Sequence, residues 1–286
     1  MYYDDIRLEK PFEFVRLPLR TEAHDVHYHE CLEVCIVLDH EVEYRFGDTV
    51  YHGEAGDIFV CRPFEPHWGI AKEADADWIL LLFSPSAVQS IPGGSTLLSP
   101  FYTQWLSVPK IPRHAPQAAL IRKAAEEAVL LHKQGGAISE ALRFKHLIDV
   151  LLLIYDYADK EGNRNLDRFE MDGVLKAIQH ILTHSKEDVD GDSLIKASGL
   201  RKSVFYRAFR ELTGVSPLLF LQRLRIQFAM DLLVRSAHRT VLQIAEDCGF
   251  QSLRTFNNQF KSYTGVSPRI YREKRARQPP HVYYIT

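Results

Sequence analysis

Four side chains in the first quarter of the chain have the chemistry of a metal or effector site. His27, His29 and Glu33 lie in one short stretch, and His67 follows further along. On an extended strand, residues two apart point the same way, so the first three share one face. If His67 comes from a neighbouring strand, three imidazoles and one carboxylate converge. That set suits a divalent metal ion, and it also suits a polar pocket that hydrogen-bonds a sugar or similar effector without metal.

A second group of polar side chains, near the C-terminus, has the chemistry of nucleic-acid recognition. If residues 202–211 form a helix, its outward side chains are Ser203, Tyr206, Arg207 and Arg210. A later helix, which Ser252 opens, turns outward Arg254, Asn257, Asn258 and Lys261. In the major groove arginine pairs with guanine and asparagine with adenine, whereas lysine and the remaining arginines hold phosphates. These eight side chains are therefore expected to contact DNA.

The elements that must position this second group are repeated. The pattern Phe-x3-Phe-x4-Gly-Val-Ser-Pro begins at Phe205 and again, 51 residues later, at Phe256. Each copy predicts a helix that ends at a glycine in the left-handed conformation, Gly214 or Gly265, and a next helix that begins at the proline. The phenylalanines of both copies are expected in the core rather than stacked on bases.

A shorter helix precedes each copy and completes a helix-turn-helix pattern. Before the second copy, a helical spacing is interrupted at Gly249-Phe250, and Ser252 then opens the next helix. The first copy matches less fully, because Arg201 stands where a capping serine is expected. Residues 216–233 between the copies predict one long helix, whose apolar positions can pack against both units, namely Leu221, Leu224, Phe228 and Leu232.

These paired motifs resemble the AraC/XylS family of bacterial transcription regulators, whose DNA-binding module has two helix-turn-helix units joined by one long helix. The resemblance covers roughly residues 172–277 and depends on the ordered glycines and prolines of both copies. It implies that Ser203, Tyr206 and Arg207 occupy positions that contact bases. Two units on one rigid helix can enter successive major grooves, which recur about every 34 Å, so a monomer would bind a long asymmetric half-site.

Charge is divided unevenly along the chain. The whole sequence has a formal net charge of −2, but residues 171–286 hold 18 Lys and Arg against 10 Asp and Glu, and residues 1–170 hold 17 against 27. Basic groups release counterions from a phosphate backbone and so give salt-dependent affinity for nucleic acid. Charge alone also fits a solvated surface, but together with the repeated motif it indicates a DNA-binding C-terminal part.

Short apolar or alternating runs in the N-terminal part predict many short strands between about residues 16 and 84. Examples are residues 32–38, 42–46 and 78–83. Close turns between such strands are typical of a sandwich or barrel. The stretch from His27 to Glu33, followed by Gly56-Asp57, Pro63 and Pro66-His67, resembles the two half-motifs of a cupin barrel. Cupin sensor domains commonly precede the DNA-binding module in this regulator family, so the two resemblances agree.

Two helices are predicted between the halves, at residues 115–132 and 138–157. The second has an apolar side made of Leu142, Leu147, Val150, Leu151 and Ile154. In the family such a pair carries dimer contacts, and packing on the barrel is the competing interpretation. Polar residues from 160 to 165 then break the helical pattern.

We therefore predict an α+β chain of two domains. Residues 1–159 would form a cupin-like β-barrel with a helical pair for effector binding and dimerisation, and residues 160–170 a linker. Residues 171–277 would form an all-α DNA-binding domain with two helix-turn-helix units, followed by a tail at residues 278–286.

Compartment and redox state are inferred from features that the sequence lacks. No apolar run is long enough to cross a bilayer, and the first five residues lack the basic and apolar regions of a signal peptide, so we expect a cytoplasmic protein without a membrane partner. The four cysteines, Cys31, Cys35, Cys61 and Cys248, include no CxxC pair. We expect reduced core residues, with a thiol sensor at Cys31 and Cys35 as the alternative.

The predicted function is regulatory rather than enzymatic. A small molecule bound by His27, His29, Glu33 and His67 would switch a homodimer on promoter DNA, provided that it binds two arrangements of the protein unequally. The family resemblance implies an activator that works with RNA polymerase, and a carbohydrate as the default effector.

Two alternatives differ in what the four residues do. A metal-dependent cupin enzyme would use them as ligands but gives no reason for the repeated motif. A metal-sensing regulator would keep the DNA-binding domain and differ in effector, with a divalent metal as the one cofactor implied.

Overall fold

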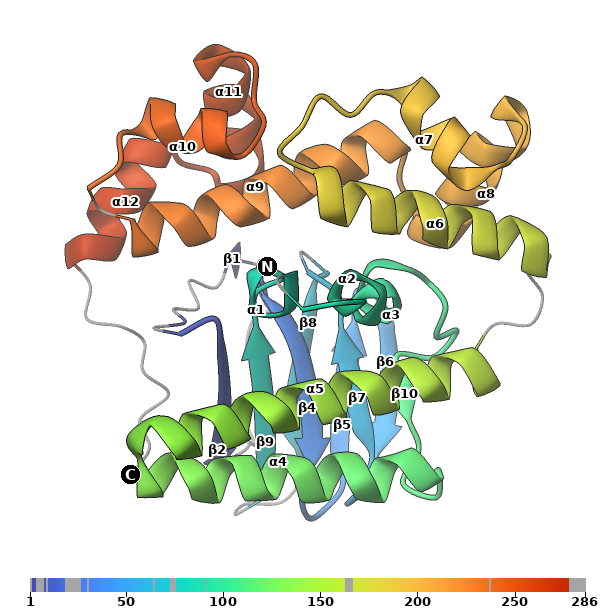
Figure 1. Ribbon diagram of the computed structural model, residues 1–286. Coiled ribbons are helices and arrows are strands. Elements are labelled where there is room, and N and C mark those ends of the chain that lie inside the picture. Colours follow the sequence, from blue (N-terminus) through green and yellow to red (C-terminus); the bar gives the residue numbers. More distant parts are fainter. Residues whose placement is uncertain are drawn as a thin grey trace.

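The chain has a β-rich N-terminal half and an all-helical C-terminal half (Figure 1). The computed structural model describes residues 2–3, 8, 10–18, 27–29, 31–63, 65–72, 76–89, 91–162, 167–236 and 238–277. The predicted tail at residues 278–286 and part of the predicted linker, residues 163–166, lie outside the described residues. Below, the N-terminal half means the described residues up to 162, and the C-terminal half means those from 167.

The strands of the N-terminal half are short, as predicted. They are β1 Tyr2–Tyr3, β2 Phe12–Pro18, β3 His27–Tyr28, β4 Leu32–Val37, β5 Val42–Phe46, β6 Thr49–Gly53, β7 Ile58–Cys61, β8 His67–Ala71, β9 Asp77–Phe83 and β10 Lys110–Ile111. They form two five-stranded sheets, with the orders β1-β3-β8-β5-β6 and β10-β7-β4-β9-β2. The predicted two-domain α+β fold with a cupin-like N-terminal half is confirmed, but the barrel is not closed, because among the described strands no hydrogen-bonded pair joins one sheet to the other.

Strand β4 shows how the two faces of its sheet are used. It lies between β7 and β9, and all six of its residues are buried. Leu32, Val34 and Ile36 belong to the large core that continues under the helices, whereas Cys35 and Val37 belong to a separate cluster with Tyr44, Phe59 and Leu80. The alternation of a strand therefore places one apolar face on the helices and the other between the sheets.

Two long helices, α4 Pro116–Gln134 and α5 Gly136–Glu161, cross this sheet (Figure 1). The predicted helical pair is confirmed and is longer than expected, with Gly135 alone between the helices at a φ of 67°. Leu147, Val150, Leu151 and Ile154 are fully buried, but Leu142 is 40% exposed, so its place on the apolar side was wrong. Helix α5 and α6, Arg168–His184, both extend into the range 160–170 that was predicted as linker.

The C-terminal half contains the repeated device. Its helices are α6, α7 Gly191–Ser198, α8 Lys202–Thr213, α9 Pro217–Arg235, α10 Val241–Asp247, α11 Leu253–Thr264 and α12 Pro268–Arg277. Gly214 and Gly265 end α8 and α11 at φ of 77° and 75°, as the repeat predicts. Ser252 caps α11, whereas Arg201 gives α8 no side-chain cap, also as predicted. The repeated phenylalanines are fully buried, namely Phe205, Phe209, Phe256 and Phe260.

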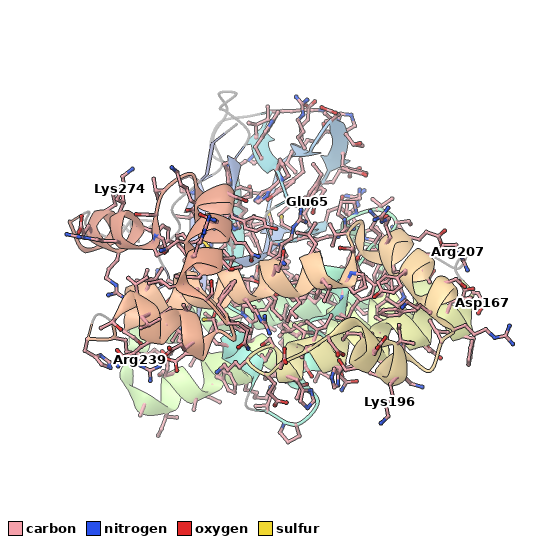
Figure 2. All side chains as sticks on the ribbon, turned by 90° about the horizontal axis from the view of Figure 1, so that it is seen from above. Glu65, Asp167, Lys196, Arg207, Arg239 and Lys274 are labelled. Carbon is pink, nitrogen blue, oxygen red and sulfur yellow. The ribbon has the colours of Figure 1, made fainter. Side chains whose placement is uncertain are left out.

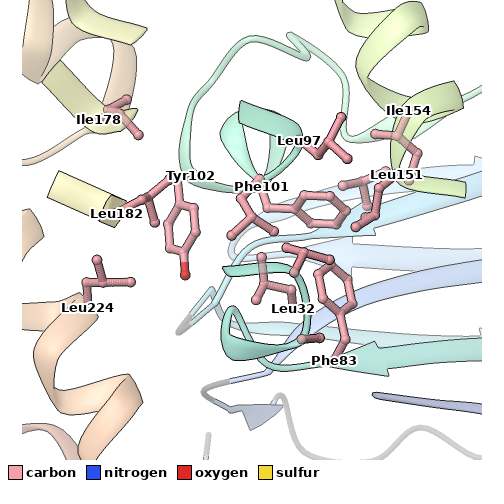
Figure 3. Packing of buried hydrophobic residues seen from close by; sticks show 14 of the residues in the cluster. Leu32, Phe83, Leu97, Phe101, Tyr102, Leu151, Ile154, Ile178, Leu182 and Leu224 are labelled. Atoms are coloured by element: carbon pink, nitrogen blue, oxygen red, sulfur yellow. The ribbon is translucent and has the colours of Figure 1, made fainter. Parts of the chain in front are cut away.

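A short segment of the N-terminal half inserts against the C-terminal half. It contains α2 Gly94–Leu97 and α3 Ser99–Tyr102, just after α1 Ser86–Gln89. Tyr102 donates a hydrogen bond of 2.7 Å to Gln227 Oε1 on α9, and its ring packs edge-on against Phe220. The backbone N–H of Gln104 donates to Leu212 O at 2.6 Å. Figure 3 shows Phe101 turned toward Leu151, and Tyr102 lying between the N-terminal half and the pair Leu182 and Leu224.

No described helix is both long and apolar enough to span a membrane.

The contact between the halves can be tested at one atom. Tyr102→Phe removes the donor to Gln227 Oε1, a buried group. We expect the free energy of unfolding, measured in urea on the full chain, to fall by about 1–3 kcal/mol. Tyr157→Phe, a half-buried phenol on α5, is the control and should change it by less than about 0.5 kcal/mol. Equal effects in the two variants would show that the hydrogen bond between the halves contributes no more to stability than the hydroxyl of half-buried Tyr157.

Candidate functional site

The structure brings His27, His29, Glu33 and His67 together at one end of the space between the sheets. Strands β3 and β8 pair there, with His27 opposite His67. The ring centroid of His67 lies 4.7 Å from that of His27 and 4.9 Å from that of His29. His29, Glu33 and His67 are buried, whereas His27 is half-buried. The cluster is therefore approached from the side of His27.

The Glu33 carboxylate is the centre of this cluster. Tyr44 donates its hydroxyl to Glu33 Oε1 at 2.7 Å, and the Cys61 thiol lies 3.6 Å from the same oxygen. On the other oxygen, Oε2, His29 Nε2 lies at 3.0 Å and His67 Nε2 at 3.5 Å. Sequence reasoning missed Tyr44 and Cys61 as members of the site. The alternation of β5 and β7 would have placed both side chains on the inner face, but not their distance from Glu33.

The electrostatics favour a charged carboxylate beside a charged imidazole. Burial alone raises the pKa of the Glu33 carboxyl, but the charge of His67 and the hydrogen bonds from His29 and His67 outweigh burial and hold it well below its usual range. Burial lowers the pKa of His67, but the Glu33 carboxylate and the hydrogen bond to the Glu65 carbonyl outweigh that and raise it. The two groups therefore stabilise each other as an ion pair.

The cysteines of the N-terminal half are unreactive by the same physics. Burial, and then the nearby Glu33 carboxylate, raise the pKa of the Cys35 and Cys61 thiols well above the usual range. All four cysteines are buried, as expected of core residues, and their reduced state stays a prediction. A thiol sensor at Cys31 and Cys35 would need an exposed thiolate, and neither thiol is exposed.

The histidines are oriented as metal ligands are. His29 Nδ1 faces the Cys31 carbonyl at 3.2 Å, and His67 Nδ1 donates to the Glu65 carbonyl at 2.7 Å. Each ring is thereby held by a backbone carbonyl while its Nε2 is turned toward Glu33 Oε2. Ligating histidines in metal sites are held in this way. Ligand atoms of His27, His29 and His67 lie within 4.8 Å of one another, and His67 Nε2 is buried. These residues therefore fit a divalent ion.

The predicted DNA-contacting side chains of α8 are not equivalent. Ser203 and Arg210 are exposed. Arg207 is half-exposed and is held by two carboxylates, with Nη2 donating to Glu170 Oε1 at 2.6 Å and Nη1 to Glu211 Oε2 at 3.0 Å. These bonds raise the pKa of Arg207. Figure 2 shows Arg207 at the outer edge of the C-terminal half, in reach of a partner outside the protein.

Tyr206 of α8 is half-buried rather than outward. Its ring packs edge-on against Phe205. A Cβ added at Gly191, the first residue of α7, would lie 2.5 Å from the Tyr206 hydroxyl. Tyr206 therefore lies on the first turn of α7, and the glycine there makes room for it.

The predicted side chains of α11 are mostly free of the core. Arg254, Asn258 and Lys261 are exposed, and Asn257 is half-buried. Thr255 is also exposed, in the first turn of the helix, where its backbone N–H donates to the Ser252 hydroxyl. Exposed basic side chains that sequence reasoning did not single out flank the two units, among them Lys196 and Lys274 (Figure 2).

Tyr44 supplies a test of the buried network. Tyr44→Phe removes the short hydrogen bond to a charged acceptor, Glu33 Oε1, with little change of shape. We expect the free energy of unfolding to fall by about 1.5–3 kcal/mol. The control is Tyr51→Phe on β6. This half-buried phenol packs against the apolar cluster between the sheets to which Tyr44 also belongs. If both variants unfold at the same urea concentration, the hydrogen bond from Tyr44 to Glu33 does not stabilise the fold.

Comparison with known proteins identifies both halves. The family described as an AraC-like ligand binding domain matches residues 11–138, and a helix-turn-helix domain family matches residues 194–274. The transcriptional activator RhaR of Yersinia pestis is 24% identical over 261 residues, 88% of this chain and 86% of that protein. The transcriptional regulator MtrA of Neisseria gonorrhoeae is 29% identical over 137 residues, 45% of this chain and 44% of that protein.

A solved structure shows the same fold over nearly the whole chain. ToxT of Vibrio cholerae aligns with a TM-score of 0.51 at 12% identity, covering 94% of this chain and 100% of that one. The relatives and the fold are those of transcription regulators rather than enzymes. The chain belongs to the AraC family, as a DNA-binding transcription regulator with an N-terminal ligand-binding domain.

Proposed function

We propose that this protein is a sequence-specific activator of transcription, switched by a small molecule bound at His27, His29, Glu33 and His67. One observation carries the proposal: the same chain holds this buried polar cluster and two helix-turn-helix units. Both units lie on helix α9, and the N-terminal half is hydrogen-bonded to that helix. The activating role is supported by the name of RhaR, a transcriptional activator. Promoter DNA would place the protein in the cytoplasm, in contact with RNA polymerase.

The proposed roles on DNA follow from exposure and charge. Arg254, Asn257 and Asn258 would contact bases in one major groove, and Ser203, Tyr206 and Arg207 bases in the next. Arg210 and Lys261 would hold phosphates. Arg207 must exchange Glu170 or Glu211 for DNA, and the exchange costs little because solvent screens an exposed ion pair.

The proposed effector is a carbohydrate. Two buried imidazoles, a carboxylate and the Tyr44 hydroxyl offer both donors and acceptors to sugar hydroxyls. Rings of Tyr44 and Phe46 lie 6.3 Å and 6.2 Å from the His67 ring and give the cluster an aromatic wall. His27, which is half-buried, would be the first residue to meet the ligand.

A metal-sensing regulator is the second candidate, favoured by the carbonyl-held histidines. His27, His29 and His67 would ligate the ion, with Glu33 completing or supporting the set, and the ion would supply a charge that fixes the cluster in one arrangement. Metal analysis of the purified protein, and DNA binding that a chelator abolishes and one metal restores, would favour this candidate over a carbohydrate.

A homodimer is proposed through the helical pair. The outer faces of α4 and α5 expose large apolar side chains, namely Leu120, Leu130, Ile138, Leu142 and Leu152. Exposed apolar side chains gathered on one element pair are typical of protein interfaces. Packing on the sheet, the competing interpretation, accounts for the buried faces of the same helices.

The function is tested by a footprint on DNA upstream of the protein's own and neighbouring genes, with random competitor and stepped salt. We expect competitor-resistant protection that spans successive major grooves and changes when carbohydrates are added. Binding that random competitor removes at every salt concentration, with and without cell extract, would contradict a sequence-specific regulator.

Arg254 is expected to recognise a base. Arg254→Ala should weaken binding to the specific site by about 1–3 kcal/mol and leave weak, salt-sensitive binding to random DNA largely in place. Arg269→Ala is the control, since this exposed arginine on α12 pairs with Glu273 and is assigned no base. Titration of labelled operator and random duplexes measures both affinities, and equal losses on the two duplexes would reject Arg254 as a base-contacting residue.

A further inference from the structure

The two helix-turn-helix units touch each other directly as well as through α9. The loop of residues 185–190 leads from α6 into α7, the first helix of the first unit, and in Figure 1 it lies next to α10 and α11. Gly249, in the turn between α10 and α11, has a φ of 82°. A Cβ added there would lie 2.9 Å from the carbonyl oxygens of both Ser185 and Lys186. The loop of the first unit and the turn of the second therefore approach too closely for a side chain at this position.

Arg225 of α9 joins this loop to this turn. Its Nε donates a hydrogen bond of 2.8 Å to the Ser185 carbonyl, and its Nη2 donates one of 2.7 Å to the Glu187 carbonyl. Its guanidinium carbon also lies 6.0 Å from the ring centroid of Phe250, which follows Gly249 in the second unit. One planar guanidinium thus contacts the first unit through two donors and the second unit through a cation–π interaction.

The surroundings of Arg225 hold its side chain in one place. Arg225 is half-buried, and burial lowers the pKa of its guanidinium, while the charge of Asp188 acts in the opposite direction. The group stays charged at neutral pH, as arginine does in proteins. Hydrogen bonds from a charged donor are stronger than neutral ones, and solvent screens a partly buried charge less than an exposed one. The contact is therefore expected to keep the two units in one relative placement.

The relative placement of the units decides which DNA sites the protein can hold with both of them. Each base pair between two contacted segments adds about 3.4 Å and about a tenth of a turn. One base pair too many or too few therefore moves one segment out of reach of a rigidly placed unit. Helix α9 alone is a single connection, and long helices bend. A second connection beside it resists that bending.

We propose that Arg225 is a positioning residue, which fixes the number of base pairs between the two DNA segments that the helix-turn-helix units contact. Arg225 acts through the loop and the turn that it joins, and it is assigned no base. Its effect on DNA rests on the proposed sequence-specific binding by both units. The placement that it imposes on the units does not, and can be measured without DNA.

The test on DNA uses the full chain and a series of labelled duplexes based on the footprinted site. In this series the segment between the two protected grooves is one base pair longer or shorter, and one further duplex keeps a single groove segment. We expect the wild-type protein to prefer the original spacing by about tenfold or more, and Arg225→Met by about threefold or less, because two charge-assisted hydrogen bonds are lost. Binding to the single-segment duplex should be unchanged.

Further variants separate placement from charge and from folding. Arg225→Lys keeps the positive charge but not the fork that reaches two carbonyls, so it should lose the spacing preference as Arg225→Met does. Gly249→Ala disturbs the same contact from the second unit, because its Cβ would meet Ser185 and Lys186, and it should act alike. Arg269→Met removes an exposed charge from α12 and is the control that keeps the wild-type preference. A folding defect lowers binding to every duplex alike and leaves this ratio unchanged.

The measurement without DNA uses spin labels at Ser203→Cys on α8 and Asn258→Cys on α11, two exposed positions, while the native cysteines are buried. We expect one narrow distribution of distances in the full chain, and a broader one after Arg225→Met but not after Arg269→Met. The positioning role is overturned if the distribution stays narrow or if Arg225→Met keeps the wild-type spacing preference. It is also overturned if Arg225→Met weakens binding to every duplex equally and lowers the salt slope by about one, as loss of a phosphate contact would. Should the footprint be missing, the distances still decide the role of Arg225.

Discussion

A buried contact between α3 and α9 joins the ligand-binding part and the DNA-binding part of this regulator. Phe101 is fully buried in the core of the N-terminal half, while the next residue, Tyr102, bonds to Gln227 and packs on Phe220. One short helix is thus shared by both cores. Because protein interiors are densely packed, a shift of α3 cannot be absorbed locally and must be passed to α9 or break the contact.

Helix α9 is the element that connects α3 to both helix-turn-helix units. It contacts α7 and α8 of the first unit and α10, α11 and α12 of the second. Leu221, Leu224 and Phe228 are buried along it, so the helix cannot turn without repacking both units. Under the proposed function, such a helix controls the joint placement of the two helix-turn-helix units. Simultaneous binding of both units in two major grooves would then depend on this placement more than on the affinity of either unit alone.

Local physics explains which parts of this structure were predictable. The glycines, prolines and Ser252 fixed the ends of α8, α9 and α11, because caps act within a few residues of themselves. His27, His29 and Glu33 do come together, but the expected single strand was wrong, because His27 lies on β3 of one sheet and Glu33 on β4 of the other. What could not be predicted depends on contacts distant in sequence: Tyr44 on Glu33, Glu170 on Arg207, and Tyr102 on Gln227, 125 residues away. Pairing of sheets is equally non-local, so a barrel was expected where the described strands form two separate sheets.

The arrangement of the two halves also explains how one chain can combine an acidic N-terminal half with a basic DNA-binding half. Helices α7, α10 and α11 lie on the far side of α6 and α9 from the sheets (Figure 1). DNA bound on that far side would be separated from the negative charge of the N-terminal half by a layer of helices. A helix with its side chains is about 10 Å across, more than the screening length of about 8 Å in physiological salt. The acidic half then weakens long-range attraction to any DNA more than it weakens close contacts. Specific contacts consequently carry a larger share of the affinity, as a regulator that must choose one site among many requires.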